Sequence, residues 1–345
     1  MSDAALHDGS NLDRLPFPVL MGDIGGTNAR FALIDTPDAP VRRLPTVHTV
    51  DFATIDEAIE AAVVRGAGSR PKSAILALAG PITGEKTQLT NCPWIVEPRK
   101  TIVRFGIAEM ILLNDFEAQA LALPDLTAAD VDPIGDGVSA PDAIRVVLGP
   151  GTGLGVGALI RAGGRWVPVP GEGPHIDLGP VTPRDMAIWP NLERVHGRIT
   201  AEALVSGPGM LRLYRGICRT DGVAPRLATP AEVTAAGLDG SDPQARETLE
   251  LFCIYLGRVS GDLALIFLAY GGVFLAGGIP PRIAPILKSG GFRQAFVSKA
   301  PYDEIVAQIA TAIVVKEDAA LAGVAAFARA PGRFGVELKG RHWRG

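Results

Sequence analysis

Two short glycine-rich tips, each flanked by β-prone runs, constrain the fold of this chain more than any other feature. The first tip lies in Asp23–Thr27, between the runs Val19–Met21 and Arg30–Asp35. The second tip, Gly149–Gly153, lies inside the run Arg145–Ile160, which again has apolar residues on both sides. This crude internal repeat predicts a turn-rich α/β protein of two similar lobes, each with a glycine-tipped hairpin, and a cleft between the lobes.

Length and charge agree with such a protein. At roughly 100 to 200 residues per domain, 345 residues predict about two domains. With 33 basic and 37 acidic residues the net charge is -4, and without a long basic run a nucleic-acid partner is not expected. The 3 cysteines lie far apart, which argues against a zinc site or a disulfide framework.

Neither the start of the chain nor its most apolar segment predicts membrane attachment. Met1–Pro16 is polar and lacks the features of an export signal, so we expect a cytoplasmic protein. The uncharged segment Leu263–Pro281 is interrupted by Gly-Gly and Pro-Pro pairs, which leaves pieces too short to cross about 30 Å of hydrocarbon. We expect a buried helix followed by a buried strand instead.

Apolar periodicity predicts the elements of the first half of the chain. Asp56–Val64 has helical spacing, and Ser73–Ala79 is a continuous apolar run typical of a strand buried on both faces. Ile111–Leu113 repeats this strand signature and ends at Asn114-Asp115, after which Phe116–Leu123 has the pattern of a helix. The polar pair is therefore expected where a strand passes into a helix.

The second half is predicted to be mainly helical. Helices are expected over Ala201–Cys218 and Asp242–Tyr270, followed by a strand at Val273–Ala276 and further helical pieces as far as Ala328. The last residues, Pro331–Gly345, have the composition of a loose tail.

The glycine tips are candidate phosphate-binding loops. Glycines let a phosphate chain approach backbone N–H groups without interference from Cβ atoms, and threonines add hydroxyl donors. A hairpin turn also needs glycine for its own positive-φ positions, so this structural explanation stays open for either loop alone. Neither loop has the context of a Walker or Rossmann motif, so a nucleotide would be held between two hairpins. The candidate residues are Gly25, Gly26, Thr27, Gly151, Thr152 and Gly153.

Asp23 stands inside the first tip, where its carboxylate would repel bound phosphates unless a divalent cation lies between them. This position suggests Mg²⁺, held through water, because Mg²⁺ keeps several waters and takes few carboxylates. The alternative is a turn aspartate that caps local N–H groups.

Asn114-Asp115 and the loop around Glu172 are candidate sites for a hydroxyl-bearing substrate. A carboxylate at the carboxyl end of a buried strand faces the crevice where α/β folds bind ligands, and it could accept a proton from an attacking hydroxyl. Helix N-capping explains Asn and Asp at such a place equally well. Glu172 and His175, in a loop rich in Gly and Pro, could grip sugar hydroxyls, or they could belong to an ordinary surface loop.

Several strings, spread from Val19 to about Arg329, together resemble the bacterial glucokinase family of the hexokinase and actin-like ATPase superfamily. They are GDIGGTNARFALID, PITG, TNCPW, LNDF, GPGTGLGV, PGEGPHIDLGP, SGPG and GGVFLAGGIPPR.

The resemblance implies a two-lobed actin-like ATPase (ribonuclease H-like) fold and transfer of a phosphoryl group from ATP, with Mg²⁺, to the 6-hydroxyl of D-glucose. It implies that Asn114 and Asp115 bind the sugar, with Asp115 as the base. It also implies three further sugar-binding residues and places two glycines near the adenosine. These are Glu172, His175, Glu202, Gly277 and Gly278.

The domain boundaries and partners are expected on the same grounds. A small domain of residues 19–124, completed by a helix at about 316–330, would precede a large domain of residues 125–315, with an extension at 1–18 and a tail at 331–345. The resemblance implies a homodimer with glucose and ATP as substrates. The alternatives are a kinase for another hexose, and a sugar sensor or actin-like ATPase without sugar kinase activity.

Overall fold

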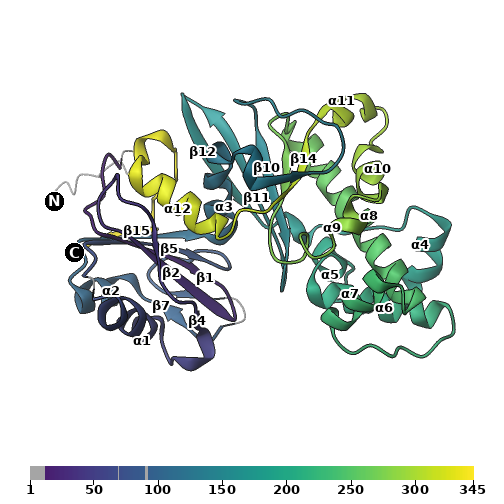
Figure 1. The fold of residues 1–345 in the computed structure, drawn as a ribbon, viewed down its shortest axis with the longest axis horizontal. Helices are drawn as coiled ribbons and strands as arrows, with labels where there is room; N and C mark the ends of the chain where they lie inside the picture. The colour runs from purple at the N-terminus through teal and green to yellow at the C-terminus, as the bar shows by residue number, and fades with distance from the viewer. Residues whose placement is uncertain (1–11, 69, 90–91) are drawn as a thin grey trace, which may run out of the picture. The chain divides into compact units, whose positions relative to one another are not determined.

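The computed structural model describes residues 12–68, 70–89 and 92–345, which form two compact units (Figure 1). Unit 1 comprises the described residues up to Asp125 together with Leu159–Pro170 and Glu317–Gly345, and unit 2 comprises Leu126–Ala158 and Gly171–Lys316. Unit 1 is thus assembled from three separate stretches of the chain. Residues 1–11 of the expected extension, and the first two residues of the string TNCPW, lie outside the described residues.

Unit 1 is built on a seven-stranded mixed sheet of order β15-β8-β5-β1-β2-β3, in which β4 also pairs with β2. β1 pairs antiparallel with β2 and parallel with β5, and β5 pairs parallel with β8. The β1–β2 pair is the first predicted glycine-tipped hairpin, which is therefore confirmed. The strands are β1 (Val19–Ile24), β2 (Asn28–Ile34), β3 (Arg42–Arg43), β4 (Val47–His48), β5 (Ser73–Leu78), β8 (Glu109–Asn114) and β15 (His342–Arg344), besides a ribbon of β6 (Thr87–Gln88) and β7 (Ile95–Val96).

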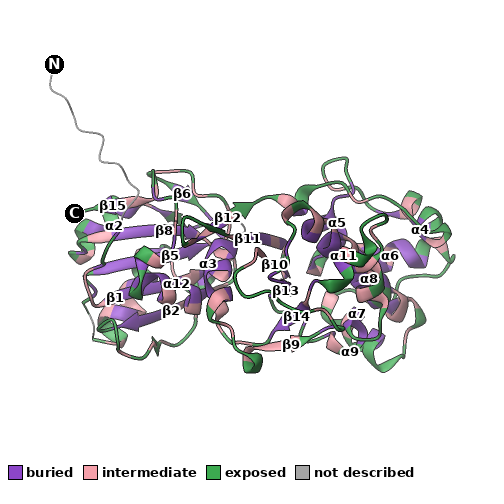
Figure 2. Cartoon of the chain, turned by 90° about the horizontal axis from the view of Figure 1, so that it is seen from above, coloured by how far each residue is buried: buried purple, intermediate pink, exposed green. Residues whose placement is uncertain are grey.

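Helices cover both faces of this sheet. On one face, strand residues such as Leu20, Leu76 and Leu112 pack with Trp94 and with the helical segment at residues 55–66, which confirms the helix expected over Asp56–Val64. The intervening residues, such as Met21, are equally buried on the face where α3 and α12 pack (Figure 2). The helices are α1 (Ile55–Ile59) with its π-helical continuation η2 (Glu60–Gly66), α2 (Pro98–Phe105), α3 (Asp115–Ala122) and α12 (Ala319–Arg329), with 3-10 turns η1 (Thr49–Asp51), η3 (Leu123–Asp125) and η7 (Pro331–Arg333).

The α3–α12 contact is unusually close because α12 presents a glycine to α3. A Cβ atom built on Gly323 would lie 1.9 Å from the carbonyl oxygen of Ala118. The surrounding residues of α12 are mostly alanines, so the two helix backbones approach each other with little side-chain material between them. The position of α3, and of the residues at its start, therefore depends on this contact.

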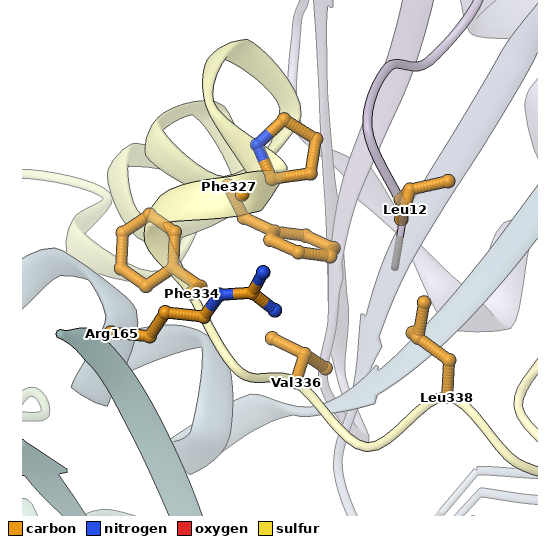
Figure 3. A pocket seen from close by; sticks show the side chains of 8 residues that line it. Leu12, Arg165, Phe327, Phe334, Val336 and Leu338 are labelled. Carbon is orange, nitrogen blue, oxygen red and sulfur yellow. The ribbon is translucent and has the colours of Figure 1, made fainter. Parts of the chain in front are cut away.

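The expectation that Pro331–Gly345 forms a loose tail is wrong. β15 pairs antiparallel with β8, and Trp343 is only 5% exposed. Figure 3 shows Phe334 and Leu338 of the same segment around Phe327 of α12, lining a crevice of about 10 Å³, which has room for about one water molecule. Three residues with one large apolar side chain are too short a pattern to reveal a strand by periodicity.

Unit 2 contains most of a six-stranded sheet of order β12-β11-β10-β13-β14-β9, in which β10, β13 and β14 run parallel. The second predicted hairpin corresponds to β10 and β11. The ends of β11 and β12, residues 159–170, belong to unit 1, although we expected them in the large domain. The strands are β9 (Val131–Pro133), β10 (Arg145–Pro150), β11 (Leu154–Ala162), β12 (Arg165–Gly171), β13 (Val273–Leu275) and β14 (Thr311–Val314).

The helices of unit 2 pack mainly around the long helix α8, which confirms the helix expected over Asp242–Tyr270. The stretch expected as one helix over Ala201–Cys218 is divided, because the Ser206 hydroxyl accepts a hydrogen bond from Gly209 N and caps a new helix. The helical prediction is wrong at Thr311–Val314, which forms the strand β14. Periodicity alone cannot tell whether so short a buried apolar run is a helix or a strand. The helices are α4 (Pro183–Ile188), α5 (Ala201–Leu204), α6 (Gly207–Thr220), α7 (Pro230–Asp239), α8 (Pro243–Phe267), α9 (Ala284–Leu287), α10 (Gly291–Val297) and α11 (Asp303–Gln308), with 3-10 turns η4 (Ala128–Asp130), η5 (Gly173–His175) and η6 (Trp189–Asn191).

A buried ionic network joins α4 to α8. The Asp185 carboxylate, which is fully buried, accepts hydrogen bonds from the Tyr255 hydroxyl at 2.9 Å and from Arg258 Nη2 at 2.7 Å. Backbone N–H groups of Val181 and Thr182 donate to it as well. Burial raises the pKa of Asp185, but the combined hydrogen bonds outweigh burial and hold the pKa below its usual range.

The apolar segment Leu263–Pro281 forms the end of α8 and the strand β13, as expected. In the described part of the chain, no helix combines the length and apolar character that crossing a membrane requires.

Candidate functional site

The first glycine tip is a tight turn that is fixed to a neighbouring 3-10 helix. Gly25 N donates to Asn28 O at 2.9 Å, which closes the hairpin. Thr49 holds the two following carbonyls, because its Oγ1 donates to Gly26 O at 2.8 Å and its N donates to Thr27 O at 3.0 Å. With these carbonyls directed towards Thr49, the tip keeps a fixed backbone conformation with Thr27 at its exposed corner.

Asp23 lies in β1 and not in the turn. It stands opposite Arg30 across the hairpin, and Arg30 Nη1 lies 3.1 Å from Asp23 Oδ2. The same guanidinium lies 3.6 Å from Asp318, through its Nε. Burial raises the pKa of the Asp23 carboxyl, while the Arg30 charge opposes that rise. Asp23 therefore belongs to a partly buried ionic cluster, and the alternative that it caps the N–H groups of the turn does not describe its contacts here.

A cation near Asp23 would favour the ionised form of this buried carboxyl. A single carboxylate suits a cation such as Mg²⁺, which keeps most of its water ligands. Over residues 12–68, 70–89 and 92–345, no group of three or more His, Cys, Asp or Glu side chains is arranged to hold a metal ion directly.

Asn114 and Asp115 lie where β8 passes into α3, as the sequence predicts. The Asn114 side chain is the N-cap, since its Oδ1 accepts from Phe116 N at 2.9 Å and from Glu117 N at 3.2 Å. Its Nδ2 donates to Gly80 O at 3.2 Å. Asp115 is the first residue of the helix, partly exposed, with its Oδ1 3.0 Å from Phe116 N. Capping thus accounts for Asn114, while Asp115 places a carboxylate at the positive end of a helix.

Sequence reasoning missed Glu117, which completes this turn. Its Oε2 accepts from Asn114 N at 3.3 Å, so the two residues form a reciprocal capping box. Arg341, from the segment expected as a tail, donates to the same Oε2 at 2.6 Å. The spacing Asn-x-x-Glu after an apolar run was a readable signal for the first contact, but nothing local predicts the second.

In unit 2, the second glycine tip packs against Glu202. Glu202 Oε2 accepts from Leu154 N at 2.9 Å, and a Cβ on Gly153 would lie 2.6 Å from that oxygen. Gly207 N, at the start of α6, donates to Gly151 O at 2.8 Å. The tip is therefore held by one side-chain contact and one backbone contact, and a Cβ at position 153 would force the Glu202 carboxylate to shift.

Gly277 and Gly278 follow β13 at the same edge of the sheet. Gly277 has a φ of +83° and packs so closely that a Cβ would lie 2.9 Å from Pro150 O. Because β13 runs parallel to β10, its carboxyl end brings these glycines beside the second tip.

Glu172 and His175 flank a single 3-10 turn. The two side chains are 66% and 52% exposed, and His175 Nε2 lies 3.8 Å from Glu172 Oε2. Arg198 fixes the backbone of this turn, because its Nη2 donates to His175 O at 3.0 Å. Both side chains therefore remain open to a ligand while the turn that carries them is held.

A cavity of about 200 Å³ in unit 2 brings together three of the predicted site residues, Thr152, His175 and Glu202. Glu172 is not among the residues that line it. These three residues bring a hydroxyl, an imidazole and a carboxylate from separate parts of the chain to one cavity. The other lining residues are Val195, His196, Arg198, Thr200, Ala203, Ser206, Pro208 and Arg212.

Comparisons with known proteins identify the class of this chain, which is that of the sugar kinases with the actin-like ATPase fold. The chain is 53% identical to a glucokinase of Brucella suis over 328 residues, which are 95% of this chain and 96% of that protein. It resembles the crystal structure of a glucokinase from an Antarctic psychrotroph with a TM-score of 0.80 and 32% identity, covering 92% of this chain and 98% of that one.

A glucokinase of the ROK family from Streptomyces griseus, solved with glucose and AMPPNP, shares the fold, with a TM-score of 0.59, 21% identity, and coverage of 90% of this chain and 99% of that one. The family model Glucokinase matches residues 20–331. The chain belongs to the glucokinase family.

Proposed function

We propose that this chain transfers the γ-phosphoryl group of ATP to the 6-hydroxyl of D-glucose with Asp115 as the general base. Phosphorylation of glucose is the activity of the family to which the chain belongs. In the reaction the sugar oxygen forms a bond to the γ-phosphorus, the bond from that phosphorus to the β–γ bridging oxygen breaks, and Asp115 accepts the hydroxyl proton. The products are glucose 6-phosphate and ADP.

The observation that carries the role of Asp115 is its place at the first position of α3. A carboxylate there is stabilised in the ionised form by the helix N-terminus, and an ionised carboxylate is what a proton acceptor requires. The turn before it is fixed by the capping box between Asn114 and Glu117. Since one hydrogen of the Asn114 amide is donated to Gly80 O, we assign the other to a hydroxyl of the sugar.

Residues of unit 2 are assigned to the remaining sugar hydroxyls, and the two glycine tips are assigned to the nucleotide. His175 and Glu202 line one polar cavity, and Glu172 adjoins His175, which supports a sugar-binding role for the three. The tips around Gly25 and Gly151 are assigned to the phosphates, with Thr27 and Thr152 supplying hydroxyls. Gly277 and Gly278, beside the second tip, are assigned to the adenosine end of ATP.

Mg²⁺ would neutralise charge on the phosphates, and Asp23 is the residue assigned to hold it through water. Asp23 is suited to this because burial disfavours its charge and a nearby cation would restore it. We also propose a cytoplasmic location and a homodimeric assembly, on the family resemblance. Sedimentation equilibrium of the purified chain would test the assembly.

The variant Asp115→Asn tests the central assignment. We expect kcat for glucose 6-phosphate formation to fall by about 10² or more, the scale of general-base loss, with an unchanged circular dichroism spectrum. The control is Asp125→Asn, whose carboxylate is half exposed and pairs with Arg333. Near-normal turnover in Asp115→Asn would reject Asp115 as the base. Measuring ADP release without sugar, and kcat/KM across hexoses that differ at one hydroxyl, separates a glucokinase from an ATPase and from a kinase for another hexose.

A further inference from the structure

The C-terminal strand β15 lies directly beside the strand that carries Asn114. Trp343 pairs with Met110 of β8, and Leu112 N donates to Arg341 O at 3.0 Å. This strand lies beyond residue 331, where the match to the family model ends. The segment after α12 therefore adds an edge strand to the sheet next to the proposed base.

Arg341 reaches from this edge to a buried acid. The Glu117 side chain is 1% exposed, and Arg341 Nη1 donates to its Oε2 at 2.6 Å. Its Oε1 is buried with no hydrogen-bond partner in the described part of the chain. Arg341 itself is only 14% exposed, and its Nη2 also donates to Glu337 O. Burial raises the pKa of Glu117, and the Arg341 charge is the leading influence that opposes the rise.

The same Glu117 oxygen contacts the backbone of the proposed sugar-binding turn. It accepts from Asn114 N at 3.3 Å, while Asn114 Oδ1 accepts from Glu117 N at 3.2 Å. Three contacts in series thus connect the C-terminal segment with Asp115: Arg341 to Glu117, Glu117 to Asn114, and Asn114 to the helix that begins with Asp115. A displacement of the Glu117 carboxylate would alter the cap, and with it the direction of the two side chains that meet the sugar.

We propose that Arg341 is a positioning residue for phosphoryl transfer, which holds the Glu117 carboxylate in the capping box and thereby fixes Asn114 and Asp115 towards the sugar. This inference rests on the proposed role of Asp115. It assigns a function in the reaction to a segment outside the family match. A guanidinium suits the task because it donates to Glu117 and to Glu337 O at once, which a single ammonium point charge does less well.

A purely structural role for β15 would predict a different result. Removing Arg341 would then lower the thermal midpoint and leave the kinetics of the folded enzyme unchanged. Positioning predicts instead that the folded variant has a lower kcat/KM for glucose, while KM for ATP stays within about 2-fold. A misplacement of about 1 Å can cost up to about 10²-fold in rate.

The experiment compares the full-length variants Arg341→Met and Arg344→Met. Arg344 lies on the same strand, is 62% exposed, and makes only a 3.5 Å contact with Glu109, so it controls for loss of a β15 arginine. We expect kcat/KM for glucose to fall at least about 10-fold in Arg341→Met and less than 2-fold in Arg344→Met. Hydrogen exchange of a peptide covering residues 112–120 should be faster in Arg341→Met only.

Two further variants separate positioning from folding. Arg341→Lys keeps a cation and should recover part of the loss. The double variant Arg341→Met with Glu117→Gln should also recover part of it, because a neutral amide oxygen can still accept from Asn114 N without an unpaired buried charge. If Arg341→Met does not fold, Arg341→Lys still tests the proposal through a smaller fall in kcat/KM for glucose at unchanged KM for ATP.

The proposal is overturned if the arginine variants that fold have the kcat/KM of the parent chain, or if 112–120 exchanges at the parent rate. Neither result bears on the outcome of the Asp115→Asn experiment, so each would reject the positioning role of Arg341 alone. Normal turnover in Asp115→Asn would instead reject the proposed base, whatever the Arg341 variants do.

Discussion

Gly323→Ala tests whether α3 and α12 approach as closely as described. The added Cβ would lie 1.9 Å from Ala118 O and 2.8 Å from Ala122 N. Since real Cβ contacts are essentially never shorter than 3.0 Å, the helices must separate by about 1 Å. Overpacking of this kind costs about 1–3 kcal/mol, and a clash with backbone belongs at the upper end. The higher helix propensity of alanine offsets about 1 kcal/mol of this cost.

The expected net loss is therefore about 2 kcal/mol of unfolding free energy, or about 4–8 °C in the thermal midpoint for a unit of this size. Circular dichroism melts would measure this shift, with Gly332→Ala as the control because a Cβ there meets no atom of the described residues within 4 Å. Since α3 begins with Asp115, we also expect a lower kcat. A midpoint that rises in Gly323→Ala, as propensity alone predicts, would refute the close approach of the helices.

The remaining predictions concern unit 2. Gly153→Ala should displace the Glu202 carboxylate, because the added Cβ would lie 2.6 Å from Oε2, and KM for glucose should rise several-fold. The control Gly179→Ala, whose Cβ meets no atom of the described part of the chain within 4 Å, should behave as the parent. An unchanged KM would separate Glu202 from the sugar. Asp185→Asn leaves Arg258 without its charge partner and should cost about 3 kcal/mol in urea unfolding at neutral pH. Because the native pKa of Asp185 is lowered, its carboxylate stabilises the folded chain above pH about 4, and this stabilisation is lost as the pH falls further. The difference in unfolding free energy between the parent and Asp185→Asn should therefore shrink in acid. A difference that stays constant with pH would contradict the ionic account.

The sequence was informative where a local pattern coincided with a strong physical demand. The β8–α3 junction was predictable because an apolar run ended at Asn114, a preferred N-cap, and the glycine tips were predictable because a hairpin must turn. Both hairpins, the buried strand β5 and the long helix α8 follow from such patterns.

The rest depends on partners distant in sequence. Trp343 is one apolar residue in a short polar stretch, and only the free edge of β8 makes it a strand. The Arg341–Glu117 pair joins positions 224 residues apart, so no window contains both. Thr311–Val314 is a strand because neighbouring strands exist to pair with it, although its apolar run alone suits a helix equally.

The division of unit 1 into three stretches has a consequence for how the protein matures. The strands β1, β5 and β8 emerge from the ribosome long before α12, yet α12 covers one of their apolar faces. Until α12 has been synthesised, α3 alone covers part of that face, so the nascent chain leaves the rest of the sheet surface open to chaperones while unit 2 is still being made. An insertion that slowed synthesis of unit 2 would therefore be expected to reduce the soluble yield through unit 1.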